Sequence, residues 1–210
     1  RFERVQEVSG GGGRPHRTLF DARHQQFLVV GSGDQSILLL ENRHGTLVRT
    51  LEKRIPELGI QYCRSITLHQ GLLHFVGNED IVIYRLERGA VSATGQVIHL
   101  PQNYQGSNDI FFLGSGHGIF TSTPQKAFLF SSLDELANGT AQDVSAAFRG
   151  TPYSVSRFDG RLWIPEITEY SAIRSYPAGG DSISQASART LFDFGEPDLP
   201  SIERKRQIPT

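Results

Sequence analysis

Methionine is absent from the 210 residues, cysteine and tryptophan occur once each, and the net charge is only −1. The single cysteine, Cys63, excludes an internal disulfide framework and a zinc site built from several cysteines. Lys and Arg total 21 against 22 Asp and Glu, a balance that does not favour nucleic-acid binding, which needs clustered cations. No apolar run approaches the ~20 residues that a membrane-spanning helix needs. These absences predict a globular chain that neither binds nucleic acid nor crosses a membrane with a helix.

What the sequence does contain favours strands and turns. Apolar residues make up 38% and charged residues 20%, and glycine (22), phenylalanine (13) and tyrosine (6) are well represented. One short helix is expected over 131–137, where Ser132 and Glu135 have the spacing of a capping box. Because the chain begins with Arg1 and has no methionine, we expect a processed, trimmed or partial chain whose targeting segment lies outside this sequence.

Four segments of the chain share one outline: three short apolar strands followed by a more polar fourth. Leu28, Leu73, Ile119 and Leu162 mark the second strand of each segment, at spacings of 45, 46 and 43 residues. The first three strands of the segments are expected at 18–20, 27–30 and 37–40; 65–68, 72–75 and 81–84; 109–112, 118–121 and 127–130; and 154–156, 161–164 and 172–175.

A period near 45 with four strands per unit is typical of a β-propeller. Gln70-Gly71, His117-Gly118 and Asp159-Gly160 stand where the first strand must reverse into the second, and glycine accepts the positive φ of such turns. The second and third strands are continuously apolar, which suits strands covered on both faces. A β-sandwich is the alternative all-β fold. We therefore predict an all-β propeller with four four-stranded blades at 16–61, 62–105, 106–150 and 151–194, a leading strand and Gly-rich linker at 1–15, and a tail at 195–210.

Four blades leave a geometric question open. A ring can close with four, but six to eight blades are commoner for such a unit, and four blades cut for a six-bladed ring would expose apolar faces at both ends. Either the ring is four-bladed, or further blades come from another chain, or the chain is part of a longer six-bladed polypeptide.

The run Leu100-Pro101 to Ser107-Asn108-Asp109-Ile110, followed by Gly116-His117-Gly118-Ile119-Phe120-Thr121-Ser122, resembles the paraoxonase/arylesterase family. The segment 159–166, Asp-Gly-Arg-Leu-Trp-Ile-Pro-Glu, is similar to another strand of that family. The likeness runs in register through most of 1–202, and the related SMP-30, gluconolactonase and strictosidine-synthase propellers fit nearly as well. The resemblance implies a hub calcium that polarises a lactone or aryl ester.

Of the ligand positions that the resemblance implies, one matches. Asn108 stands where the family has a calcium-binding Asn, and we expect it to be a metal ligand if the site exists. Calcium takes six to eight oxygen ligands, so one Asn cannot hold it alone. A small shift in register would bring Glu7, Glu196 or Asp198 into ligand positions. The remaining family positions fall on His16 and Arg17, Cys63 and Arg64, Thr151, and Pro200 and Ser201.

Other candidate residues have plainer explanations. His74 lies in an apolar strand and is predicted to be structural, and Cys63 is predicted to be a buried, inert thiol. Glycine-rich Gly114–Gly118 precedes a strand rather than a helix, so it is predicted to be a turn and not a phosphate loop. The pairs Glu79-Asp80 and Glu166/Glu169 are predicted to serve hairpins. The sequon Asn138-Gly139-Thr140 would gain meaning in a secreted or luminal protein, and the compartment stays open.

Two functions therefore remain. We favour a non-catalytic or degenerate paraoxonase-like propeller that serves as a binding or assembly module, with no cofactor, and that meets a protein partner or itself through open blade edges. The alternative is a calcium-dependent hydrolase of lactones or aryl esters with Asn108 among its ligands. No catalytic residue can be assigned from the sequence, because propellers host many functions.

Overall fold

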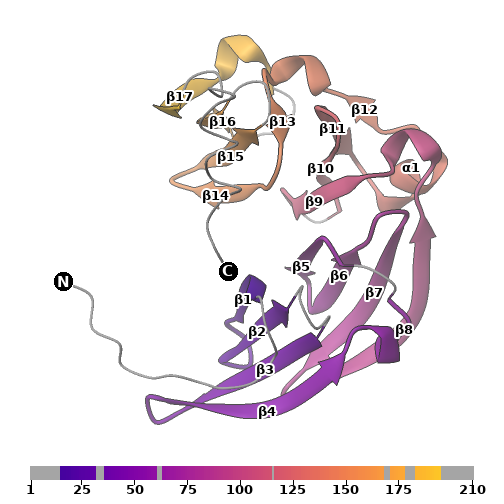
Figure 1. The fold of residues 1–210 in the computed structure, drawn as a ribbon, viewed down its shortest axis with the longest axis vertical. Helices are drawn as coiled ribbons and strands as arrows, with labels where there is room; N and C mark the ends of the chain where they lie inside the picture. Colours follow the sequence, from indigo (N-terminus) through magenta and orange to yellow (C-terminus); the bar gives the residue numbers. More distant parts are fainter. Residues whose placement is uncertain are drawn as a thin grey trace, which may run out of the picture. The chain divides into compact units, whose positions relative to one another are not determined.

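A computed structural model describes residues 15–31, 36–60, 63–114, 116–167, 171–177 and 183–194, and these form an almost entirely β structure (Figure 1). The strands pair into four separate antiparallel sheets. One α-helix, α1 (Leu133–Asn138), occurs in this part of the chain, with single 3₁₀ turns at Pro56–Leu58, Gln102–Tyr104, Ser145–Ala147 and Gln185–Ser187. Within the described ranges no helix is long and apolar enough to cross a membrane. The all-β prediction with four sheets of about four strands is confirmed.

Each sheet, or blade, is built from consecutive strands, as expected from the repeat. The first contains β1 (Pro15–Asp21), β2 (Gln26–Gly31), β3 (Ser36–Arg43) and β4 (Thr46–Arg54), and the second contains β5 (Ser65–His69), β6 (Leu72–Val76), β7 (Asp80–Glu87) and β8 (Ala90–His99). The third contains β9 (Ser107–Phe112), β10 (Gly118–Ser122), β11 (Lys126–Phe130) and β12 (Gln142–Asp143). The fourth contains β13 (Thr151–Pro152), β14 (Ser156–Phe158), β15 (Arg161–Ile167), β16 (Ala172–Pro177) and β17 (Arg189–Asp193).

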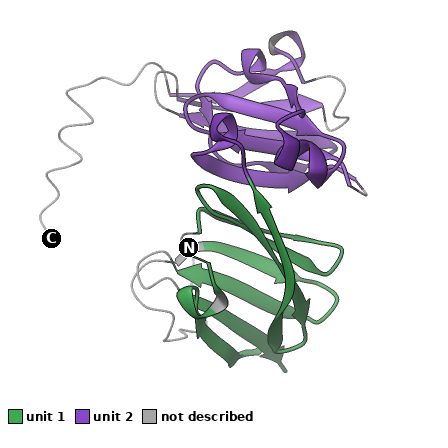
Figure 2. Cartoon of the chain, turned by 90° about the vertical axis from the view of Figure 1, so that its right-hand side faces the viewer, with its two compact units in different colours: residues 1–99 green, residues 100–210 purple. Residues whose placement is uncertain are grey.

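The chain divides into two compact units, residues 1–99 and 100–210, and each has its own core (Figure 2). Successive strand side chains point to opposite faces, so alternate apolar residues of the first two sheets can pack against each other. The core of the first unit contains, among others, Leu28, Val30, Ile37 and Leu39 of the first sheet and Ile66, Leu73 and Phe75 of the second. Each of these side chains is at most 2% exposed, which places the repeat's marker leucines in the core.

The second unit repeats this packing between the third and fourth sheets. Ile119 and Ala127 of the third sheet lie in one cluster with Leu162, Ile164 and Tyr176 of the fourth. Phe148, from the segment that joins the two sheets, completes the cluster, and its ring centroid lies 5.2 Å from that of Tyr176. Large aromatic side chains therefore fill the space that two facing sheets leave between them.

The first strand of the fourth sheet differs from the prediction. We expected one strand at 154–156, but β13 and β14 are two short pieces, and both pair with β15. The break has two causes: Pro152 has no N–H to give to a ladder, and the N–H of Val155 donates to the Asp109 carboxylate at 2.9 Å instead.

The helix and the turns follow the sequence with two corrections. Glu135 does not complete the expected capping box, because its carboxylate accepts the N–H of Ser131 and Ser132 makes no side-chain cap. The turns at 70–71 and 159–160 have the positive φ that was predicted. Gly118, in contrast, is not a positive-φ residue: a Cβ there would lie under 3.0 Å from the backbone oxygen of Phe111 and the ring of Phe130.

Candidate functional site

The residue predicted to bind metal, Asn108, lies in β9 with its side chain buried. Its amide donates a hydrogen bond to the backbone oxygen of Pro152 at 3.2 Å. The adjacent Asp109 is fully buried, and its carboxylate accepts the N–H groups of Ile110 and Val155, each at 2.9 Å. The Asn-Asp pair thus joins the third sheet to the fourth, and its role as a calcium site stays a prediction.

Two of the other family positions make hydrogen bonds within their own unit. The hydroxyl of Thr151 accepts the N–H of Gln125 at 3.1 Å, and Arg17 donates to the hydroxyl of Ser65 at 2.7 Å. Among the described residues, no group of three His, Cys, Asp or Glu side chains could hold a metal ion. Five positions named from the sequence lie outside the described residues: Glu7, Glu196, Asp198, Pro200 and Ser201.

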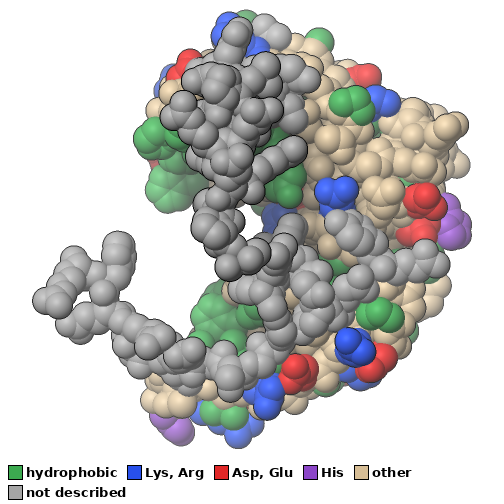
Figure 3. Space-filling model, viewed as in Figure 1, with side chains coloured by type: hydrophobic (Ala, Val, Ile, Leu, Met, Phe, Trp, Pro, Cys, Tyr) green, Lys and Arg blue, Asp and Glu red, His purple; other side chains and the backbone are tan. Residues whose placement is uncertain are grey.

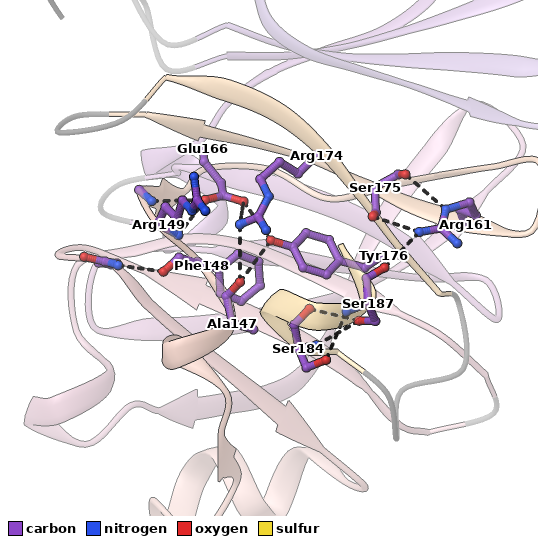
Figure 4. A network of polar contacts seen from close by, with 12 residues as sticks. Ala147, Phe148, Arg149, Arg161, Glu166, Arg174, Ser175, Tyr176, Ser184 and Ser187 are labelled. Atoms are coloured by element: carbon purple, nitrogen blue, oxygen red, sulfur yellow. Dashed lines mark hydrogen bonds and ion pairs between the residues drawn. The ribbon is translucent and has the colours of Figure 1, made fainter. Parts of the chain in front are cut away.

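The most extensive buried polar network surrounds Glu166 of β15 (Figure 4). One carboxylate oxygen accepts the N–H groups of Arg149 (2.7 Å) and Gly150 (3.0 Å). The other accepts the Tyr176 hydroxyl at 2.7 Å and the Arg174 guanidinium at 3.2 Å. Burial and then the Glu166 carboxylate raise the pKa of Tyr176, which therefore stays protonated and able to donate. Sequence reasoning assigned Glu166 to a hairpin, and that was wrong: it fixes the segment joining the sheets, while Glu169 lies outside the described residues.

A second polar network joins the two sheets of the first unit. The fully buried Gln26 donates to Asp21 (3.0 Å) and to the backbone oxygen of Glu87 (2.9 Å), and its own oxygen accepts the N–H of Gly89 (3.0 Å). Close by in the sequence, Glu41 pairs with Arg43 at 2.8 Å and with Arg88 across the sheets. Hydrogen bonds from these two arginines lower the pKa of Glu41. Asp21 and Glu41 of the first sheet are thus used in holding the unit together.

His74 is buried, as predicted, whereas Cys63 is only partly buried where it packs against the core of the first unit. Burial raises the pKa of the Cys63 thiol to about 12, and this outweighs the lowering by the backbone of Ser65 and by the charge of Arg17. The thiol also donates a hydrogen bond to the backbone oxygen of Ser65 at 3.3 Å. A thiol with that pKa is almost entirely protonated at neutral pH and is a poor nucleophile. His74 is 2% exposed on β6, and its ring centroid lies 6.5 Å from that of His69.

The environment of His74 predicts a specific pH dependence of stability. Burial, and then the neighbouring His69, lower the pKa of His74 from 6.5 to about 4. Because the folded state holds the neutral form, the stabilisation is complete above pH 6.5 and is lost as the pH falls toward 4, by roughly 3 kcal/mol for a shift of this size. Glutamine cannot titrate, so the urea midpoint of His74→Gln should change less between pH 7 and pH 4.5 than that of the parent protein. An equal slope in both proteins would contradict this assignment.

The acidic groups of the first unit act in a different pH range. Burial raises the pKa of Asp21, but hydrogen bonds from Gln26 and His24 outweigh it and lower the pKa overall, as the arginines do for Glu41. Their contribution is lost only as the pH falls below their ordinary values near 4. The loss of stability caused by His74 can therefore be separated from that caused by Asp21 and Glu41.

A half-open pocket in the described part of the first unit combines polar and apolar walls. It has a volume of about 440 Å³ and lies beside the β6–β7 loop that carries Glu79 and Asp80. The backbone of this loop closes through a bond from Gly77 N–H to the Asp80 oxygen at 2.8 Å, and the Asp80 carboxylate contacts His99 at 2.6 Å. Glu79 and Asp80 lie in the hairpin, as the sequence indicated, and the Asp80 carboxylate is paired with the His99 ring.

Sequence reasoning missed the apolar face on the fourth sheet that points away from the core of the second unit. Phe158 is 65% and Phe192 56% exposed. Figure 3 shows hydrophobic side chains gathered at the surface near β14 and β17 (upper left). We call this surface the aromatic face; strand register places on it Phe158 of β14, Trp163 and Pro165 of β15, Ile173 of β16 and Phe192 of β17. The signal in the sequence was the alternation of 161–167, whose odd positions are also apolar at Trp163, Pro165 and Ile167.

The sequon lies apart from these features. Asn138 is the last residue of α1 and is exposed, and Gly139 follows it with φ 68°. The geometry leaves Asn138 accessible, and the secreted or luminal interpretation stays a prediction.

No family model matches the chain, and no curated protein sequence matches it. Similar solved structures include the WD40 domain of Neurospora crassa Pan2, at 12% identity and TM-score 0.52, over 81% of this chain and 48% of that one. Two others are each described as a "putative 6-phosphogluconolactonase": from Bacteroides uniformis (12% identity) and Bacteroides fragilis (14%), both with TM-score 0.53, over 84% of this chain and 53% of theirs.

The chain spans about half the length of these structures. At such low identities the likeness shows the fold alone, and that fold is the β-propeller. None of these three structures is described as a paraoxonase or an SMP-30 protein, so that finer assignment remains a resemblance of sequence.

Proposed function

We propose that this β-propeller is a non-catalytic binding and assembly module. The observation that carries the proposal is the aromatic face: two phenylalanines more than half exposed on a sheet whose opposite face is packed into the core of the second unit. The largest exposed apolar patch of a soluble protein is often functional, and aromatic side chains dominate the energetics of protein interfaces. Propellers related in fold include a WD40 domain.

The polar residues that could perform chemistry support the same proposal. Glu166, Asp109 and Glu41 each accept several hydrogen bonds that hold neighbouring sheets together. A carboxylate whose two oxygens already accept hydrogen bonds from the scaffold is poorly placed to bind a metal or to accept a substrate proton. The hydrogen bonds of these three carboxylates therefore favour a structural role for them.

The alternative is a calcium-dependent hydrolase of lactones or aryl esters. It is favoured by the sequence resemblance around Asn108 and by the two neighbours described as lactonases. In that case Asn108 would have to exchange its hydrogen bond to Pro152 for a calcium ligand role and gain carboxylate ligands from other residues.

Calcium dependence separates the two functions. The binding-module proposal predicts that millimolar calcium or a chelator leaves the melting temperature unchanged, because no calcium site contributes to the folded state. It also predicts no hydrolysis of a γ-lactone or phenyl acetate above the rate in buffer. The melting temperature of Asn108→Asp should then also be unchanged by calcium. A calcium-dependent rise in melting temperature, together with lactone hydrolysis that Asn108→Ala abolishes, would establish the hydrolase instead.

A further inference from the structure

We propose that the aromatic face of the fourth sheet binds a second copy of this chain, with the same face of each copy at the contact. This inference deepens the proposed function by naming the surface and the partner. It rests on the proposed function, because an assembly module needs a surface through which it binds its partner.

The aromatic face is continuous across the sheet. The rings of Phe158 and Trp163 meet edge to face, with centroids 5.5 Å apart. Pro165 pairs with Ile173 across β15 and β16, and Ile173 pairs with Phe192 across β16 and β17. One apolar row therefore runs over four strands, and such a row has the form of one half of a sheet-on-sheet interface.

The outer strand β17 of the fourth sheet lacks the charged protection that the outer strand β4 of the first sheet has. β4 carries Arg49, Glu52, Lys53 and Arg54, and charged side chains discourage pairing at an edge. β17 is exposed along its whole length and carries Leu191 and Phe192, with Phe194 directly after it. Phe194 is 67% exposed, so the apolar surface extends past the end of the strand.

The area of this surface matches what a two-fold dimer needs. A phenylalanine presents roughly 150–250 Å², so Phe158, Phe192 and Phe194 alone expose about 300–450 Å² of apolar surface. A standard interface removes about 800 Å² from each partner, of which a little over half is apolar. A contact between the same faces supplies this area equally from both sides, and two-fold contacts of this kind are the commonest in oligomers.

The charges around the aromatic face allow it to meet a copy of itself. Arg189, which pairs with Ser175 of β16, and Asp159, which follows Phe158 in the β14–β15 turn, are exposed beside it. Arg161 also lies on this side, but its guanidinium donates to Ser175 and to the backbone oxygen of Ser187. Because both signs are present at the rim, a two-fold axis can place Arg opposite Asp rather than like charge opposite like charge.

Light scattering combined with size exclusion tests the proposal. From low to high micromolar concentration, the mass should rise from the monomer's 23.3 kDa to twice that value. Phe158→Ser and Phe192→Ser should each raise the dissociation constant at least about tenfold, as expected for aromatic residues at the centre of an interface. Circular dichroism and the melting temperature establish that each variant is folded.

Phe20→Ser is the matched control, because Phe20 is 49% exposed on β1 of the other unit. It should leave the dimer unchanged. A monomer at every concentration, or a dimer that only Phe20→Ser weakens, would overturn the proposal. The proposed function fails separately, through calcium-dependent lactone hydrolysis, so a monomer without that activity removes the second copy as partner and leaves a module that binds another protein.

Discussion

Glu166→Ala is expected to destabilise the second unit by about 3–5 kcal/mol, the range for removing one partner of a buried ion pair. The substitution leaves Arg174, 6% exposed at its side chain, without its carboxylate. It also leaves the N–H groups of Arg149 and Gly150 without their acceptor, and each orphaned buried donor costs about 1–3 kcal/mol. Urea unfolding followed through Trp163, the single tryptophan and a residue of the same strand, measures the effect directly.

Glu79→Ala provides the control for this experiment. Glu79 is exposed in the β6–β7 loop of the other unit, so its removal should change stability by no more than about 0.5 kcal/mol. If Glu166→Ala and Glu79→Ala lower the urea midpoint equally, the Glu166 network does not hold the fourth sheet in place.

Gly118→Ala is expected to destabilise the third sheet by at least about 2 kcal/mol. The added Cβ would lie under 3.0 Å from the backbone oxygen of Phe111, which cannot move without breaking the β9–β10 ladder. The nearest ring carbon of Phe130 would also lie within 3.0 Å of the added Cβ. Overpacking of this kind commonly costs about 1–3 kcal/mol, and a backbone obstacle puts it at the upper end.

Gly116→Ala is the matched substitution two residues away. Its Cβ would meet only the backbone oxygen of Ser131, at an ordinary 3.7 Å. Thermal unfolding of the two variants should therefore differ clearly, with Gly116→Ala close to the parent protein. Equal melting temperatures for both would show that β9 and β10 do not approach each other as described.

The repeat could be predicted from the sequence because each blade needs inner strands that are apolar on both faces. Continuous apolar strands such as 37–40 and 81–84 are covered on both sides, and β3 is buried over six successive residues from Ser36 to Glu41. Local turn chemistry at 70–71 and 159–160 was equally legible, since positive φ follows from the residue types. The period of about 45 residues therefore predicted the number of sheets.

Hydrogen bonds between residues far apart in the sequence could not be predicted, and they explain the errors at β13–β14 and at Glu166. Val155 leaves the ladder because Asp109, 46 residues away, accepts its N–H. Glu166 resembles a hairpin residue by its position, but its carboxylate accepts hydrogen bonds from donors at 149–150 and 174–176. Neither partner can be found from local spacing. The aromatic face was missed because an exposed Phe and a buried Phe are alike in a sequence, and the alternation of 161–167 does not show which residues of neighbouring strands share its outer face; the register of the paired strands does.

Hydrogen exchange of the intact chain at low and high concentration tests the central claim most directly. Among the described strands β17 pairs only with β16, and its residues are exposed, so its amides should exchange early in a single copy. At high concentration we expect new protection confined to β14, β15 and β17, and none in β1. Protection that is independent of concentration, or that increases only in the first unit, would contradict an assembly surface on the fourth sheet.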